Sequence, residues 1–173
     1  MFKITKRVEG RSLLGGNYPP GVYENGLITI PTIEDSSKLN NAIEWPVYHK
    51  YKIVAYNCMG DLFIQGNESP AIGYLWLQFG YGRFIAKTAT DWISLIYNEG
   101  LDKEKFLETF AFNYVSKFKG YLPYGSIYTL NPIRALGGGS DTDALDKCDI
   151  GHLDVYISIV SQTFIPDGWG QFA

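Results

Sequence analysis

The distribution of apolar and polar positions divides the chain into a strand-rich first half and a helix-rich second half. Residues 21–30 predict a β-hairpin, because Asn25-Gly26 is a strong turn signal between two runs of β-forming residues. Residues 47–86 contain short β-branched and aromatic runs separated by glycines, which predict an antiparallel meander. Residues 33–43 are polar and predict either a loop or one or two helical turns.

Helical periodicity follows the meander and predicts helices near residues 90–99, 102–117 and 140–162. In the second of these, Phe106, Phe110 and Tyr114 recur every four residues, so we expect them to form its buried face. In the third, Ile150, Leu153, Ile157 and Val160 fall on one helical face. Val155, Ile157 and Ile159 also fit the alternation of a strand. A short apolar run at 127–130 predicts a last strand before this segment.

Gly137 and Gly138 predict a structural turn between that strand and the last helix. Glycine adopts positive φ without steric cost, so we expect one of the two to do so. Ser140 is the expected N-cap of the helix, and Asp141 and Asp143 suit its positive N-terminal end. The glycine turn lacks the lysine and hydroxyl of a phosphate-binding loop, and its aspartates would repel an anion.

Together these elements predict an α+β fold, with a mostly antiparallel sheet of about five or six strands and C-terminal helices packed on it. The 173 residues, with 46% apolar and 19% charged, suit one domain over 1–173. We expect residues 1–17 to be a lead-in, loosely structured or paired at a sheet edge. We expect residues 166–173 to be a mobile tail.

The net charge indicates which partners the protein could bind, and the hydropathy of the chain indicates where in the cell we expect it. The formal net charge is −3 and the isoelectric point is about 5.3, which argues against direct nucleic-acid binding and suits an acidic surface that meets a basic partner. The start has no apolar signal-peptide segment, and no apolar stretch is long enough to span a bilayer. We therefore expect a cytoplasmic protein that does not enter a membrane.

The residues carry no recognisable active site or metal site. His49 and His152 are far apart and have no cysteine pattern beside them, and Asp141, Asp143 and Asp146 do not match a calcium loop. Cys58 and Cys148 favour free, partly buried thiols, with a single disulfide left open. No nucleophile motif is present. We expect no cofactor, no metal and no enzymatic activity.

The segment from Gly120 onward resembles the C-terminal domain of bacterial type VI secretion immunity proteins, which often follows a GAD-like domain. The resemblance rests on Gly120-Tyr121-Leu122, on Ile127-Tyr128 and on the run from Pro132 to Gly138, and it covers roughly residues 57–163. Arg134 stands where the family motif has an apolar residue. Gly60-Asp61-Leu62-Phe63 is also similar to the wider group of yeast cell-wall-regulator-like immunity proteins.

The resemblance implies a non-enzymatic immunity protein that binds a cognate bacterial toxin, such as a nuclease effector, and neutralises it by occlusion. We expect the binding surface to be acidic and to carry exposed aromatic residues. The candidate partner-binding residues are loop carboxylates: Asp61, Glu68, Asp141, Asp143 and Asp146. The alternative is a small-ligand-binding protein or an enzyme that uses the turn between Gly137 and Asp143.

Overall fold

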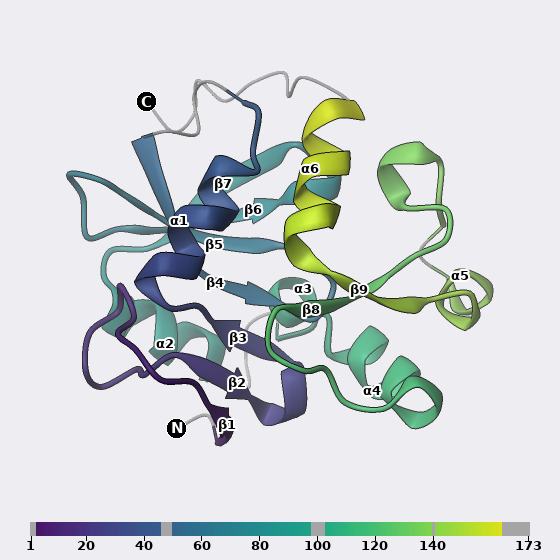
Figure 1. Ribbon diagram of the computed structural model, residues 1–173, viewed down its shortest axis with the longest axis horizontal. Helices are drawn as coiled ribbons and strands as arrows, with labels where there is room; N and C mark the ends of the chain where they lie inside the picture. The colour runs from purple at the N-terminus through teal and green to yellow at the C-terminus, as the bar shows by residue number, and fades with distance from the viewer. Residues whose placement is uncertain (1–2, 46–49, 98–102, 140, 164–173) are drawn as a thin grey trace.

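The computed structural model describes residues 3–45, 50–97, 103–139 and 141–163, and it confirms an α+β fold (Figure 1). A seven-stranded antiparallel sheet has the order β1-β2-β3-β4-β5-β6-β7, and β8 and β9 form a separate antiparallel pair. The strands of the main sheet are β1 (Ile4–Arg7), β2 (Gly21–Tyr23), β3 (Ile28–Ile30), β4 (Tyr51–Asn57), β5 (Leu62–Gly66), β6 (Ile72–Trp76) and β7 (Tyr81–Ala86). The small sheet consists of β8 (Ser126–Thr129) and β9 (Asp149–His152).

The helices are distributed over both faces of the main sheet and over one of its ends. They are α1 (Ile33–Asn41), α2 (Ala89–Tyr97), α3 (Lys103–Leu107), α4 (Thr109–Lys119), α5 (Thr142–Asp146) and α6 (Leu153–Thr163), with short 3₁₀ turns η1 (Glu24–Gly26), η3 (Leu77–Phe79) and η4 (Arg134–Leu136). Within the described residues, no helix is long and apolar enough to cross a membrane.

Both faces of the central strands are buried, so the sheet is the middle layer of the molecule. On β5, Leu62 and Ile64 belong to one core cluster, while the intervening Phe63 belongs to another and lies against Trp92 of α2. This alternation follows from the two-residue period of a strand. It explains why the meander has apolar runs rather than alternating apolar and polar residues.

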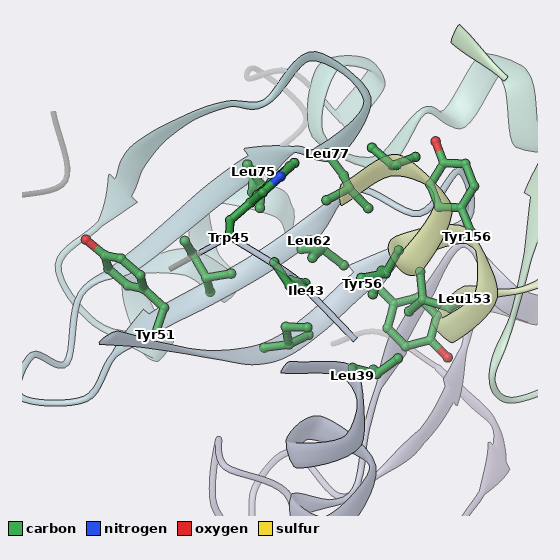
Figure 2. Packing of buried hydrophobic residues seen from close by; sticks show 14 of the residues in the cluster. Leu39, Ile43, Trp45, Tyr51, Tyr56, Leu62, Leu75, Leu77, Leu153 and Tyr156 are labelled. Atoms are coloured by element: carbon green, nitrogen blue, oxygen red, sulfur yellow. The ribbon is translucent and has the colours of Figure 1, made fainter. Parts of the chain in front are cut away.

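Helices α1 and α6 cover one face of the sheet, and α2 and α3 cover the other. Figure 2 shows Leu39 of α1 and Leu153 and Tyr156 of α6 packed around the side chains of the central strands. The indole nitrogen of Trp45 donates a 3.0 Å hydrogen bond to the carbonyl oxygen of Ser161, which fastens the C-terminal half of α6. A third cluster, at one end of the sheet, joins α4, α5 and β8.

Most predictions for the first half are confirmed. The hairpin pairs β2 with β3 and places Gly21 opposite Ile30. The meander forms β4 to β7. Part of the expected lead-in pairs at the sheet edge as β1. Residues 33–41 form a regular helix, because the hydroxyl of Thr32 accepts the Asp35 N–H and caps it. The sheet is larger than the five or six strands expected.

The prediction of one helix over 102–117 is wrong. Glu108 has a left-handed conformation, with φ 54°, and divides the segment into α3 and α4. The carboxylate of Glu104 accepts the Phe110 N–H at 2.7 Å and so starts the second helix. Because the break changes the helical phase, Phe106 is buried while Phe110 is 54% exposed. The buried side of α4 is formed instead by Ala111, Phe112 and Val115.

The prediction of a continuous helix over 140–162 is also wrong. The segment contains α5, then β9, then α6. Ile150 does not share a helical face with Leu153, since it lies in β9 opposite Tyr128 of β8. That pairing joins residues distant in sequence, and so local periodicity did not reveal it. The tail expected at 166–173 lies outside the described residues.

The glycine turn is confirmed, but its neighbours differ from the prediction. Gly137 has φ 90° and ends η4, not the strand itself. A Cβ atom on Gly138 would lie 2.0 Å from the carbonyl oxygen of Pro132, so only glycine fits there. Asp141, rather than Ser140, caps α5, because its carboxylate accepts the Ala144 N–H at 3.0 Å. Ser140 lies outside the described residues.

A buried polar cluster organises the turn between β4 and β5. The side-chain oxygen of Asn57 accepts the backbone N–H groups of Met59 and Asp61, each at 3.0 Å. The carboxylate of Asp61 accepts the Tyr74 hydroxyl at 2.9 Å and the Leu77 N–H at 3.2 Å. These bonds tie the turn to the middle of β6 and the start of η3.

Burial and a nearby charged side chain together raise the pKa of Asp61. Burial, and next the nearby Glu108 carboxylate, raise the pKa of Asp61 to about 7, although hydrogen bonds from Tyr74 and Asn57 and the charge of Arg134 oppose the rise. Burial also raises the pKa of Glu108. Arg134 lies 3.6 Å from Glu108, with their side chains only 10% and 18% exposed. Arg134, which differs from the motif of the family that the chain resembles, therefore pairs with Glu108 at the helix break.

The first prediction concerns the two sides of α4. Phe112 is 8% exposed, so we expect Phe112→Ala to lower the free energy of unfolding by about 3 kcal/mol. Phe110→Ala removes an exposed ring, and we expect a loss below about 1 kcal/mol. Urea unfolding of both variants measures the difference. Equal losses would contradict the observed helical phase.

The second prediction concerns pH. The native pKa of Asp61 lies above its unfolded value, so between these values the native state holds a proton that the unfolded state has released. We therefore expect the free energy of unfolding to fall as the pH rises through the window from about 4 to about 7, with a contribution of at most about 1.4 kcal/mol per pH unit.

Asp61→Asn removes this titration, and urea unfolding at several pH values should show a smaller slope. The slope should not vanish, because the pKa of Glu108 is raised in the same direction. Glu68→Gln changes an exposed carboxylate and is the matched control, with the slope of the parent protein expected. A slope that is the same in Asp61→Asn and in the parent would contradict the assignment.

Candidate functional site

The outer side of α4 carries a row of three aromatic side chains, of which the two outer ones are exposed and the middle one, Tyr114, is half-buried. Phe110, Tyr114 and Phe118 follow one another at four-residue spacing, which places them on one side of the helix. The rings of Phe110 and Tyr114 are 6.1 Å apart, and those of Tyr114 and Phe118 are 5.8 Å apart. Phe110 and Phe118 are 54% and 49% exposed. We call these three residues the aromatic stripe.

The stripe is held at the surface by the core beneath it. On the other side of α4, Phe112 and Val115 pack into the third core cluster together with Leu145 of α5. Tyr121, just after α4, is 63% exposed and stacks on Phe112 with 6.4 Å between the ring centres. Since α4 is anchored by these buried contacts, the stripe is a fixed feature of the surface.

The short helix α5 places carboxylates beside the aromatic stripe. Asp141, Asp143 and Asp146 are all exposed. The Tyr114 hydroxyl donates a 2.8 Å hydrogen bond to Asp146, and this bond is the main reason why the pKa of Tyr114 is raised. We call the aromatic stripe and these three aspartates the α4–α5 face.

On this side of the molecule, among the described residues, some carboxylates form ion pairs and others do not. Lys119, at the end of α4, binds Asp149 at 2.7 Å. Asp143 and Asp146 form no ion pair within the described part of the chain. The α4–α5 face therefore combines aromatic area with two carboxylates that are available to a cationic group.

The structure brings together three of the five predicted partner-binding residues. Asp61 is 1% exposed and serves the buried turn, so the expectation that it lies on a binding surface is wrong. Glu68 is exposed, but it lies in the β5–β6 turn, at the end of the sheet opposite to α5 (Figure 1). Asp141, Asp143 and Asp146 are neighbours on α5. Of these, Asp141 is already engaged as the helix cap.

The sequence did not assign Phe110, Tyr114 and Phe118 to the surface. Their four-residue spacing was visible, but it continued the spacing of Phe106 and was interpreted as one buried face. The break at Glu108 lies inside this pattern and rotates its second part outward. The carboxylate of Glu104, in the preceding helix, caps α4 by accepting the Phe110 N–H, but this contact depends on the break itself and leaves no signal in the sequence.

The remaining polar candidates line a cleft away from α4 and α5. His152 lines a cleft of about 260 Å³ between α1 and the start of α6, together with Asp35 and Tyr124. The Asp35 carboxylate there accepts the hydroxyl of Tyr124 at 2.7 Å. Burial alone would raise the pKa of Asp35, but hydrogen bonds from Tyr124 and Thr32 and the nearby Lys38 lower it. His49 lies outside the described residues.

Neither cysteine nor metal chemistry has a site among the described residues. Cys58 and Cys148 are buried and free, as predicted, and burial raises the pKa of both thiols, that of Cys148 to about 11. Raised pKa values keep both thiols protonated and unreactive at neutral pH. Over the ranges that the structure describes, no group of three or more His, Cys, Asp or Glu side chains is placed to hold a metal ion.

Comparison with known proteins identifies a similar fold. No protein-family model matches the chain, and no curated protein matches it. A solved structure that is similar is the crystal structure of Atu4351 from Agrobacterium tumefaciens, with a TM-score of 0.61 and 19% sequence identity. The similarity covers 83% of this chain and 70% of that chain. At this level of identity the likeness concerns the fold alone.

Proposed function

We propose that this protein is a non-enzymatic, cytoplasmic immunity protein that binds a cognate bacterial toxin through the α4–α5 face and neutralises it by occlusion. The observation that carries the proposal is the aromatic stripe beside Asp143 and Asp146. Aromatic residues dominate the binding energy of many protein interfaces, and carboxylates without ion pairs attract a basic partner.

The properties of the α4–α5 face suit a protein partner more than a small molecule. The stripe is a row along a helix, and the buried side chains of Phe112 and Val115 anchor that helix from its other side. A rigid surface loses little conformational entropy on binding, which favours a tight complex. The unpaired aspartates select a partner with a basic surface, such as that of a nuclease that binds nucleic acid.

The resemblance of residues 57–163 to type VI secretion immunity domains supports the same function. The run from Pro132 to Gly138, which carries much of that resemblance, holds η4, and Arg134 in it pairs with Glu108 at the start of α4. This segment therefore supports α4, so it contributes to the proposed binding face through the fold rather than through chemistry of its own.

The third prediction tests this face with the cognate toxin as the partner, to be identified by affinity purification of the chain from its native cells. We expect the double variant Phe110→Ala with Phe118→Ala to raise the Kd on the order of 30-fold, mainly through faster dissociation, because aromatic anchors are lost. We expect Asp143→Lys with Asp146→Lys to lower the association rate by about tenfold and to reduce its dependence on salt. Surface plasmon resonance measures both rates.

Glu68→Lys is the matched control, because it reverses an exposed charge at the opposite end of the sheet and should leave both rates close to those of the parent protein. Protection of toxin-exposed cells should decline in the same order as the affinity. Unchanged binding in both double variants would exclude the α4–α5 face. Turnover of a substrate by the purified chain alone would overturn the non-enzymatic function.

A further inference from the structure

A second group of aromatic and charged residues lies where β6 and β7 meet α3. Trp76 of β6 is paired with Tyr81 of β7, and Tyr74 is paired with Arg83. The guanidinium carbon of Arg83 lies 5.7 Å from the ring centres of both Trp76 and Phe106. The ammonium group of Lys105 lies 5.8 Å from the ring centre of Trp76. Two cations therefore share one indole ring.

Arg83 and Lys105 have no acidic partner in the described part of the chain. The Nε atom of Arg83 is buried and has no hydrogen-bond partner among the residues that the structure places. A buried donor that lacks a partner costs free energy, and a half-buried cation costs more when no anion compensates it. The two cations therefore contact aromatic rings, but no carboxylate in the described part of the chain balances their charge.

We propose that Trp76, Arg83 and Lys105 form a binding site for an oxyanion, either a carboxylate or a phosphate group. A guanidinium group that lies over two rings is restricted in orientation, and its planar fork matches the paired oxygens of such an anion. Lys105 supplies a second positive charge. The ring of Tyr81 is 51% exposed and lies 5.6 Å from that of Trp76, so it offers apolar contact to the rest of the ligand.

This inference goes beyond the proposed function and does not depend on the α4–α5 face, since it uses different residues and a ligand of opposite charge. The oxyanion has two chemical sources: an acidic side chain of a protein, or a small phosphorylated compound. In both cases two oxygens of the anion would bind the guanidinium group of Arg83. The two sources are distinguished by testing a phosphate compound and an acidic peptide separately.

The experiment follows the indole N–H signal of Trp76 by two-dimensional NMR at constant ionic strength. Inorganic pyrophosphate and a hexaglutamate peptide are titrated separately into the full chain. We expect at least one probe to shift the signal with a saturating curve. Saturation with pyrophosphate assigns the site to phosphorylated compounds, and saturation with the peptide alone assigns it to acidic protein segments.

Variants test whether the named cations are responsible. We expect Arg83→Gln to weaken binding at least about tenfold, and Lys105→Gln to weaken it about threefold. Arg83→Lys keeps the charge but loses the fork, so its affinity should fall nearly as far as that of Arg83→Gln. Lys52→Gln removes an exposed cation on β4 and should bind like the parent protein.

Thermal unfolding of each variant verifies that it is folded, and Lys105→Gln, at an exposed position, keeps the test valid should Arg83→Gln prove unstable. Absence of saturation with both probes at about 10 mM would overturn the proposal, since that concentration exceeds the Kd of even a weak specific site. Equal affinity of the parent, Arg83→Gln and Lys105→Gln would overturn it as well.

Discussion

The buried side chains of Asn57 and Asp61 fix the end of the sheet on which the second half of the chain is built. Asn57 closes the β4–β5 turn through two backbone N–H groups, and its amide nitrogen donates a 3.0 Å hydrogen bond to the carbonyl oxygen of Phe106, at the end of α3. Asp61 fastens the same turn to β6 and η3. A buried polar group must have its hydrogen bonds satisfied, so these elements have little freedom to move apart. The position of α3, and with it the start of α4, follows from this constraint.

The surface that we assign to partner binding follows from the break after α3. A continuous helix would have buried Phe110 and Tyr114 beside Phe106. The left-handed residue Glu108, the cap from Glu104 and the ion pair between Glu108 and Arg134 turn α4 so that its aromatic residues face outward. Such a conformation is uncommon for a residue other than glycine, and it persists only where surrounding contacts hold it. The same contacts therefore maintain the fold and expose the aromatic stripe.

The parts of the structure that could be predicted from sequence are those with local signals. Asn25-Gly26 indicated the hairpin, the glycine-separated apolar runs indicated the meander, and Gly137 adopts the positive φ expected of it. Non-local interactions decided the rest. Ile150 lies in a strand because β8 provides its partner. Asp61 resembled a loop carboxylate, and only the fold shows that Asn57 and Tyr74 enclose it. Of the candidate site, the α5 carboxylates were predicted, while the aromatic stripe depended on a helix break that periodicity concealed.

The most direct measurement of the central claim is hydrogen–deuterium exchange of the chain, alone and in complex with the proposed toxin partner. Backbone amides exchange more slowly where a partner excludes water or suppresses local opening. The account predicts that protection on binding is concentrated in residues 109–121 and 141–149, which carry the aromatic stripe and the aspartates of α5. The β5–β6 turn, at the other end of the sheet, should exchange at an unchanged rate. Protection confined to that turn, or to any region apart from α4 and α5, would contradict the account.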